Sequence, residues 1–515
     1  MDTQTCYDWL FVFFVHQADG YVATWDAIIN DIEKMGPGAN SCIYLIQDSL
    51  KVETDLHQVG HQTNVFSLNV QNLGRDPATG KWKFLPVPVY IDNESRKCWK
   101  TAFEYIYRNV KAKRRVLACF SHGAAFGINL DTSPSRREEF KLKDLKTGDL
   151  ILDTINKVNT IGEYPEIGKL NANLPAIAGQ NTTVEVRTNA DYILDNQDIA
   201  GIKNLLELST IDKSSPEFIQ MEKYVEDGRI PKDKIGSLCK ALEILWISDL
   251  ANALKLYLGD SRIDLLLLNN CYMQNFDTGF LLRNNVDYIV ASEGWLNASG
   301  FDYPALLTRM QTDAALPGAE LARGAVLDYI QFYKDRNMTD DLNQQAVFAN
   351  DISLYPRALT LFNQLLDVLE ANIKVIISDL VDIRENQVSY VSCPYSQYSN
   401  NYLCMVDALL WVELAICSLL KRVPNAFGCT PMLAQFRDMK AKIVVQSSVG
   451  QKYIDFDKDA VNKYGYSGLS IFYPTKADRA TLKLTPWCAY FGKQVKGDWE
   501  TKWMRFLNIY YNEQV

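Results

Sequence analysis

The sequence predicts an α/β protein built on a doubly wound, mostly parallel β-sheet. Short, continuous apolar runs such as 10–15 and 265–268 have the composition of strands buried on both faces, which is typical of parallel sheets. Between such runs, apolar residues recur at helical spacing, as they do from Trp25 to Met35. Strands that alternate with helices form βαβ units, and successive βαβ units build a parallel sheet.

The strand–helix rhythm can be followed in chain order. A helix that ends at Gly36 separates the first two strands, and a helix at about 99–110 precedes the third. Ser248 is the expected N-cap of the helix before the fourth strand. The expected core strands are 10–15, 42–46, 116–120, 265–268 and 288–292.

The chain divides into three parts, since 515 residues are too many for one compact core. Residues 1–130 and 246–310 form the α/β core. Residues 131–245 break the rhythm with a polar, proline-containing stretch, which we interpret as a long insertion on the functional edge of the sheet. Residues 311–515 are expected to be mainly helical. Late strands are expected in this last part, at 442–446 and 468–473.

Charge and composition exclude several classes of protein. The formal net charge is -9 and no basic tract occurs, so we expect no nucleic-acid partner. The 11 cysteines include no C-x-x-C pair, which argues against a disulfide framework or a structural zinc site. The only membrane-length stretch, 402–420, is interrupted by Asp407 and Glu413, so we expect a core helix and no membrane partner. No secretory signal is visible; we expect a cytoplasmic protein if the chain is complete and a secreted one if a signal was removed.

Two reactive side chains follow predicted strands at once. Cys271 comes after the leucine run 265–268 and two asparagines, and His122 comes after the strand at 116–120. The carboxyl ends of parallel strands meet at one edge of the sheet, which is where ligands bind in open α/β sheets. Helical spacing from Met273 onward predicts a helix N-terminus beside the cysteine, and its dipole would favour the reactive thiolate. We therefore predict that Cys271 and His122 meet at this edge.

Peptide-bond cleavage by a cysteine needs a thiolate nucleophile, a histidine that handles the leaving-group proton, and hydrogen-bond donors for the oxyanion. Gly123 fits the third role, because a residue without a side chain lets its N–H approach a substrate carbonyl. Taken alone, Cys271 could be a buried structural cysteine and His122 a hydrogen-bonded turn residue. Their positions on two strand ends favour the catalytic interpretation.

The motifs around these residues resemble the clostripain-family cysteine peptidases, which share the caspase–haemoglobinase fold with caspases, gingipains and legumains. The resemblance implies a cysteine endopeptidase that acts on protein or peptide substrates and needs no cofactor, although some family members require calcium. The residues that carry it are Ser-His-Gly at 121–123, Asn-Cys-Tyr-Met at 270–273, Ala-Ser-Glu at 291–293, Gly-Phe-Asp-Tyr at 300–303 and, more faintly, the segment 467–474.

The resemblance also implies roles for individual residues. His122 would be the general acid or base and Cys271 the nucleophile. The N–H groups of Gly123 and Cys271 would form the oxyanion hole. The insertion lies between the two catalytic residues, so we expect either self-cleavage within it or a stable, uncut accessory subdomain.

Substrate preference is where the resemblance and the residues disagree. The family usually carries an aspartate two residues before the cysteine, where it binds a basic P1 side chain, but this chain has Asn269. Ser292 and Glu293, at the end of the neighbouring strand, are the other expected substrate-binding residues. We expect either a weakened basic preference that depends on the Glu293 carboxylate or a shift to a neutral polar P1 residue.

Three other functions compete with the peptidase. A catalytically silent relative would keep the fold and use the insertion and the helical region to bind partners. A nucleotide-binding protein is disfavoured because no G-x-x-x-x-G-K-[ST] or G-x-G-x-x-G motif occurs. A metalloenzyme is disfavoured because no histidine pair has ligand spacing on a predicted helix, so no metal site is expected.

Overall fold

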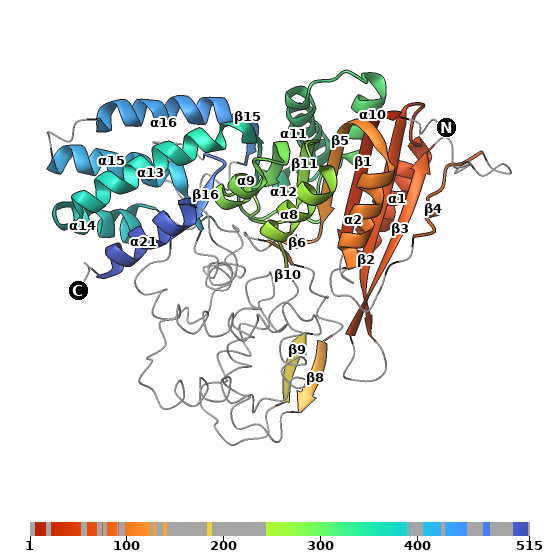
Figure 1. Cartoon of the computed structure of the whole chain (residues 1–515), viewed down its shortest axis with the longest axis horizontal. Helices are drawn as coiled ribbons and strands as arrows, with labels where there is room; N and C mark the ends of the chain where they lie inside the picture. Colours follow the sequence, from red (N-terminus) through yellow and green to blue (C-terminus); the bar gives the residue numbers. More distant parts are fainter. Residues whose placement is uncertain are drawn as a thin grey trace.

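The computed structural model places a nine-stranded sheet at the centre of the protein, with helices on both faces (Figure 1). The described residues are 6–16, 22–52, 59–69, 75, 80–89, 91, 98–123, 127–129, 137–141, 183–187, 244–388, 391, 405–423, 428–450, 467–473 and 498–512.

The strand order of the sheet is β15-β13-β12-β11-β5-β1-β2-β3-β4. The five middle strands, from β12 to β2, are parallel, and the strands outside them are antiparallel. The α/β prediction is therefore confirmed, and the parallel strands are the five that the apolar runs predicted. The bounds are β1 (Cys6–His16), β2 (Ser41–Val52), β3 (Val59–Asn69), β4 (Leu85–Pro86), β5 (Lys111–Phe120), β11 (Ile263–Asn269), β12 (Val286–Ser292), β13 (Ala346–Asp351) and β15 (Val444–Val449).

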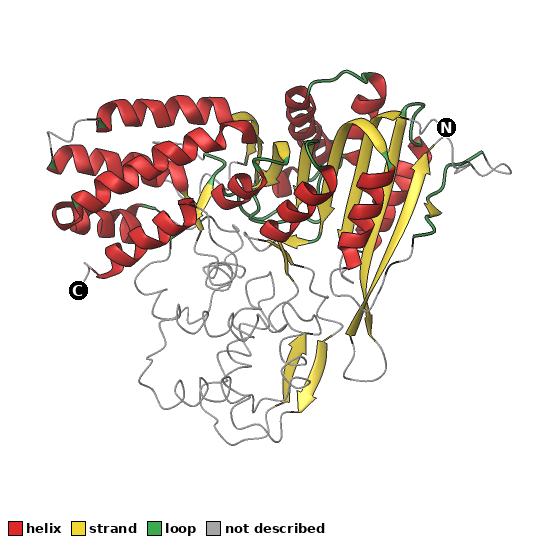
Figure 2. Cartoon of the chain, viewed as in Figure 1, coloured by secondary structure: helices red, strands yellow, loops and turns green. Residues whose placement is uncertain are grey.

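Helices cover both faces of the sheet because each parallel crossover places its helix on one side (Figure 2). One layer consists of α2 (Cys98–Asn109), α8 (Ile247–Leu258) and α9 (Phe276–Leu282). The other consists of α1 (Val22–Met35), α10 (Tyr303–Thr312) and α11 (Gly318–Asp335), with the short α12 (Thr339–Leu342) after them. Helix α8 begins at Ile247, so Ser248 is its second residue and the N-cap prediction was wrong.

The two ends of the insertion lie next to each other in one small sheet. Strands β6 (His122–Gly123), β7 (Gly127–Asn129) and β10 (Ile244–Trp246) form a small antiparallel sheet in which Asn129 pairs with both His122 and Ile244. Between them the structure describes only the hairpin-like pair β8 (Arg137–Lys141) and β9 (Thr183–Arg187). The rest of the insertion, and with it the expectation of self-cleavage, lies outside the described residues.

The C-terminal part is mainly helical, as expected, but it also extends the central sheet. Strands β13 and β15 lie beyond residue 310 and pair next to β12, so the sheet continues across that boundary. The helices lie together at one end of the molecule (Figure 1). They are α13 (Tyr355–Ala371), α14 (Ile373–Asp382), α15 (Ala408–Arg422), α16 (Cys429–Ile443) and α21 (Asp498–Asn512), with the 3-10 turn Ile352–Leu354 and the π-turn Ile383–Gln387.

Aromatic packing and one short sheet hold the C-terminal helices together. Phe362, Trp411, Trp503 and Phe506 form a cluster of ring contacts. Strand β14 (Met405–Asp407) pairs with β16 (Ser470–Phe472). In the membrane-length stretch, α15 forms the predicted core helix and buries most of its apolar residues, but residues 405–407 are strand β14 and residues 402–404 lie outside the described residues. In the described part of the chain, no helix is both long and apolar enough to cross a membrane.

Candidate active site

The two predicted catalytic residues leave neighbouring strands at the same level. Strands β5 and β11 are adjacent and parallel, and their last paired residues are Phe120 and Asn269. His122 and Cys271 each follow two residues later, so the register alone brings the two chain segments to one edge of the sheet. The described structure of His122 is its backbone in β6; its side chain lies outside the described part.

The backbone of Gly123 lies against the backbone of Cys271. A Cβ atom added at residue 123 would overlap the Cys271 carbonyl oxygen and would lie 2.6 Å from the Cys271 nitrogen. Only glycine fits this contact without a shift of the chain. The residue next to His122 is therefore packed directly on the candidate nucleophile.

A side chain reinforces the same junction. The amide Nδ2 of Asn270 donates a hydrogen bond of 2.7 Å to the carbonyl oxygen of Ser121. Both residues are buried, and each immediately precedes a candidate catalytic residue. The bond lies just beyond the last backbone pairing of β5 with β11.

The sulfur of Cys271 is held by the segment 293–300 that follows β12. The Leu296 N–H donates to Sγ at 3.3 Å, and the Cys271 thiol donates to the Leu296 carbonyl oxygen at 3.6 Å. Cys271 is 4% exposed. An N–H donor at this distance stabilises negative charge on sulfur, which is the charge of the nucleophilic thiolate.

The segment 293–300 is itself anchored at several points. The Asn297 N–H donates to Oε1 of Gln345 at 2.7 Å, and the Asn297 amide donates to Asp341 at 3.0 Å. The Ser292 hydroxyl lies 3.0 Å from the carbonyl oxygens of Trp295 and Ala346. The hydroxyl of Ser292, predicted to contact substrate, is thus used within the protein to fix the turn after β12.

Helix α9 begins later than the sequence predicted. Four residues separate Cys271 from Phe276, its first residue, and Asn275 caps it by accepting a hydrogen bond from the Thr278 N–H. Tyr272 takes a positive φ of 61°, which turns the chain away from β11. The predicted helix N-terminus therefore follows Cys271, but four residues further along the chain and after a turn.

The Asn269 side chain packs against the turn at Gly300. It is buried, and a Cβ atom at residue 300 would overlap its side-chain amide. Its Oδ1 makes no hydrogen bond of good geometry within the described residues, but the side chain lies close enough to the Tyr303 hydroxyl to interact with it. The side chain that stands where the family has an aspartate is thus a neutral, buried acceptor close to the segment that holds Cys271.

Glu293 points into the C-terminal part of the protein. Its side chain has no exposed surface, and its carboxyl group lies close to Asp407, which caps α15. Neither oxygen makes a hydrogen bond of good geometry within the described residues, but the two carboxyl groups are near enough to interact. Burial first, and then the Asp407 charge, hold the pKa of Glu293 well above its ordinary 4.5, while Lys440 opposes the shift. The described residues that interact with this carboxyl group all belong to the C-terminal part of the chain: Asp407, Gly468, Lys440 and Tyr355.

This raised pKa makes a prediction for stability. A group whose pKa is higher in the folded state stabilises the fold below its unfolded pKa, and that stability is lost as the pH rises toward the folded value. Glu293→Gln removes this titration while keeping the shape of the side chain. We expect the variant to gain free energy of unfolding relative to wild type, by up to about 1.4 kcal/mol per pH unit, as the pH rises from about 5 to about 8. Urea denaturation of both proteins across this range measures the difference.

Glu320→Gln, on the exposed side of α11, is the control for the substitution itself. A free-energy difference between wild type and Glu293→Gln that stays constant over this pH range would show that Glu293 titrates alike in the folded and unfolded chains.

Several residues of the site could not be predicted from the sequence. The Leu296 N–H is a backbone group and has no sequence signature, and Gln345 and Asn297 act through contacts that form only in the fold. Asn270 was visible beside the cysteine, but nothing in the sequence showed its bond to Ser121. Among the described residues, no three His, Cys, Asp or Glu side chains are grouped so that they could hold a metal ion.

Comparison with known proteins finds one matching family and several similar solved structures. The model of the clostripain family matches residues 235–509. Among solved structures, the chain is similar to an inactive zymogen C11 protease from Parabacteroides distasonis, with 13% identity and a TM-score of 0.48 over 95% of this chain and 99% of that one. It is also similar to a secreted C11 cysteine protease from Bacteroides thetaiotaomicron, with 11% identity and a TM-score of 0.47 over 95% of this chain and all of that one. No curated protein matches the chain.

The family match covers more than half of the 515 residues. It includes Cys271 with Asn269, Ser292 and Glu293, and it begins after His122. The chain therefore belongs to the clostripain family of cysteine peptidases.

Proposed function

We propose that this cysteine peptidase is an endopeptidase in which Cys271 is the nucleophile and His122 the acid and base. The Cys271 thiolate adds to the carbonyl carbon of the scissile peptide bond, and the N–H groups of Gly123 and Cys271 donate to the resulting oxyanion. Collapse of this intermediate breaks the C–N bond, and His122 gives a proton to the leaving amine. Water, deprotonated by His122, then hydrolyses the thioester and regenerates the thiolate.

The observation that carries this proposal is the contact between Gly123 and Cys271. Backbone against backbone, it holds the His122 segment at the candidate nucleophile although the two residues are far apart in the sequence. It also brings together the backbones of the two residues whose N–H groups are the proposed oxyanion donors. The Leu296 N–H supports the proposal further, because it stabilises negative charge on Sγ.

For substrate preference we propose a neutral polar P1 residue, with basic P1 residues cleaved less well than is usual in the family. A buried guanidinium without a carboxylate partner is unfavourable by several kcal/mol before relaxation. Asn269 offers only an amide acceptor in this position. The burial of Glu293 against Asp407 supports this choice over a basic preference that depends on Glu293.

A panel of irreversible peptidyl electrophiles that differ only at P1, with Arg, Lys, Asn or Ala, tests both parts of the proposal. We expect covalent label on Cys271, located by peptide mass mapping, with the Asn reagent reacting faster than the Arg reagent. In Asn269→Asp, the rate ratio of Arg to Asn should rise by roughly 10- to 100-fold, because a hydrogen bond to a charged partner contributes about 1.5–3 kcal/mol.

The outcomes separate the alternatives. Absence of label on Cys271 with every reagent would favour the catalytically silent relative. Label on Cys271 with a P1 ratio that Asn269→Asp leaves unchanged would keep the peptidase and refute the P1 assignment. Glu293→Gln is the matched control, and we expect it to label with the wild-type P1 profile.

A further inference from the structure

Asn270 lies where the segments that carry His122 and Cys271 leave the central sheet. Regular pairing of β5 with β11 ends at Phe120 and Asn269. Beyond these residues β5 gives way to β6, which pairs with β7 in the separate three-stranded sheet. Backbone pairing of β5 with β11 therefore stops two residues before His122 and Cys271.

The Asn270 side chain continues the connection past this point. Its Nδ2 donates to the Ser121 carbonyl oxygen at 2.7 Å, in a place where Asn270 is 1% exposed and Ser121 is also buried. A buried hydrogen bond without competing water holds its partners more rigidly than an exposed one. Ser121 is the residue before His122, and Asn270 is the residue before Cys271.

We propose that Asn270 is a positioning residue that sets the distance between the His122 segment and Cys271. The inference rests on the proposed function, since it concerns the same two residues. Asn270 acts through the backbone of Ser121 and not through contact with substrate. Gly123 contacts the backbone of Cys271, and Asn270 bonds to the residue that precedes His122, so two contacts join the same two segments.

The bond, rather than the bulk of the side chain, carries this role. The Asn270 Oδ1 has no hydrogen-bond partner within the described residues, so half of the buried amide contributes nothing to polar pairing. A leucine of similar size would fill the space without leaving that acceptor unpaired. The donor to Ser121 is the one polar function of this side chain that the described structure shows.

The test uses the full chain with Asn270→Ala and Asn270→Leu. We expect kcat for a peptide substrate to fall by about 10- to 100-fold in both, with KM nearly unchanged, because a misplacement of about 1 Å can cost about 10²-fold. If Asn270 only filled space, leucine would restore the activity lost in the alanine variant. The two variants therefore distinguish packing from positioning even where alanine lowers stability.

Asn350→Ala is the matched control. Asn350 is also fully buried and also donates to a backbone carbonyl, that of Gly468 at 3.0 Å, but on β13 and within the C-terminal contacts. We expect it to lower the melting temperature while kcat stays within about threefold of wild type, a smaller change than the misplacement of catalytic groups produces. Equal losses of kcat in the Asn270 and Asn350 variants, or rescue by Asn270→Leu, would overturn the positioning role and leave the proposed function intact. A wild-type protein without peptidase activity would overturn both.

Discussion

Cys271→Ala is expected to abolish peptidase activity, while Cys119→Ser retains it. The two cysteines lie near the ends of adjacent strands, β11 and β5, and Cys119 pairs with Leu268. The sequence already favours Cys271 as the nucleophile, since Cys119 lies inside the predicted strand 116–120. Their surroundings differ, and that difference decides the prediction.

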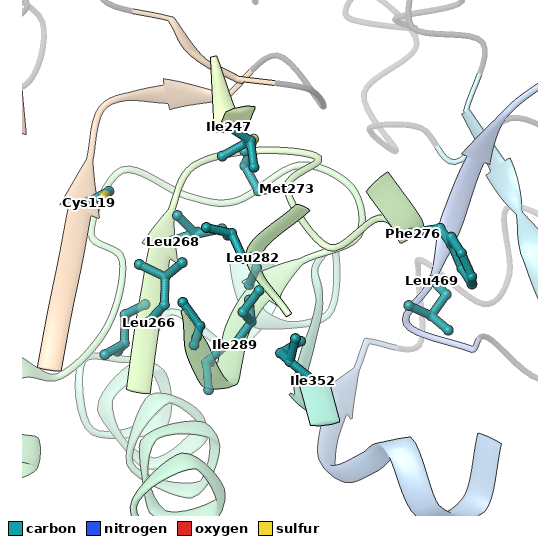
Figure 3. Close-up of a cluster of buried hydrophobic side chains, with 14 of the residues drawn as sticks. Cys119, Ile247, Leu266, Leu268, Met273, Phe276, Leu282, Ile289, Ile352 and Leu469 are labelled. Atoms are coloured by element: carbon teal, nitrogen blue, oxygen red, sulfur yellow. The ribbon is translucent and has the colours of Figure 1, made fainter. Parts of the chain in front are cut away.

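Cys119 belongs to the apolar core. It has no exposed surface and lies in the buried cluster of Figure 3 together with Leu266 and Leu268. Burial raises the pKa of the Cys119 thiol far above its ordinary value, so the reactive thiolate is suppressed. Cys271 instead lies beyond its strand, with the Leu296 N–H at its sulfur and Gly123 at its backbone. Of these two cysteines, Cys271 is the one for which the described structure shows an N–H donor at the sulfur.

The measurement is hydrolysis of a fluorogenic peptide by the purified full chains. We expect no detectable turnover for Cys271→Ala, and for His122→Ala a fall of roughly 10²–10⁴-fold, the contribution of a positioned acid or base. Circular dichroism and melting temperature confirm that each variant is folded. An inactive Cys119→Ser beside an active Cys271→Ala would reverse the assignment of the nucleophile.

The parallel part of the fold was predictable because its strands are buried on both faces. Such strands read as continuous apolar runs, and β1, β5 and β11 all follow that pattern. Strand β13 was missed because six residues within a helical region carry no such signal, and β12 pairs with it only in the fold. The sequence predicted a strand from residue 442, but β15 begins at Val444. Helix α16 continues through Ile443 and delays the start of the strand.

The positions of site residues at strand ends could be predicted from the sequence. The directions of their side chains could not. Adjacency of the strands before His122 and Cys271 was predicted and is confirmed. Glu293 follows β12 as expected, but its carboxyl group lies close to Asp407, a residue remote in sequence. No local pattern encodes that contact. The catalytic roles of His122 and Cys271 stay predictions that the substitutions above test.

Gly123→Ala is expected to lower kcat/KM by at least about 10³-fold, although no side-chain function is removed. A methyl group at residue 123 would overlap the Cys271 carbonyl oxygen and lie 2.6 Å from the Cys271 nitrogen. Backbone atoms cannot yield as a flexible side chain can, so β6 must move away from β11. That movement displaces His122 and the Gly123 N–H together, and loss of one oxyanion donor alone costs about 10²–10³-fold.

Gly259→Ala is the control for a glycine substitution that introduces no overlap. Gly259 has a positive φ of 59°, but a Cβ atom there would meet nothing within 4 Å. We expect that variant to lose some stability, on the order of 1 kcal/mol, and to keep wild-type kcat/KM. Steady-state kinetics and thermal melts of the two variants separate the effect on the site from the effect on the fold. If Gly123→Ala kept activity within about threefold of wild type, far less than an oxyanion donor contributes, then the contact of Gly123 with Cys271 could not be what brings the catalytic groups together.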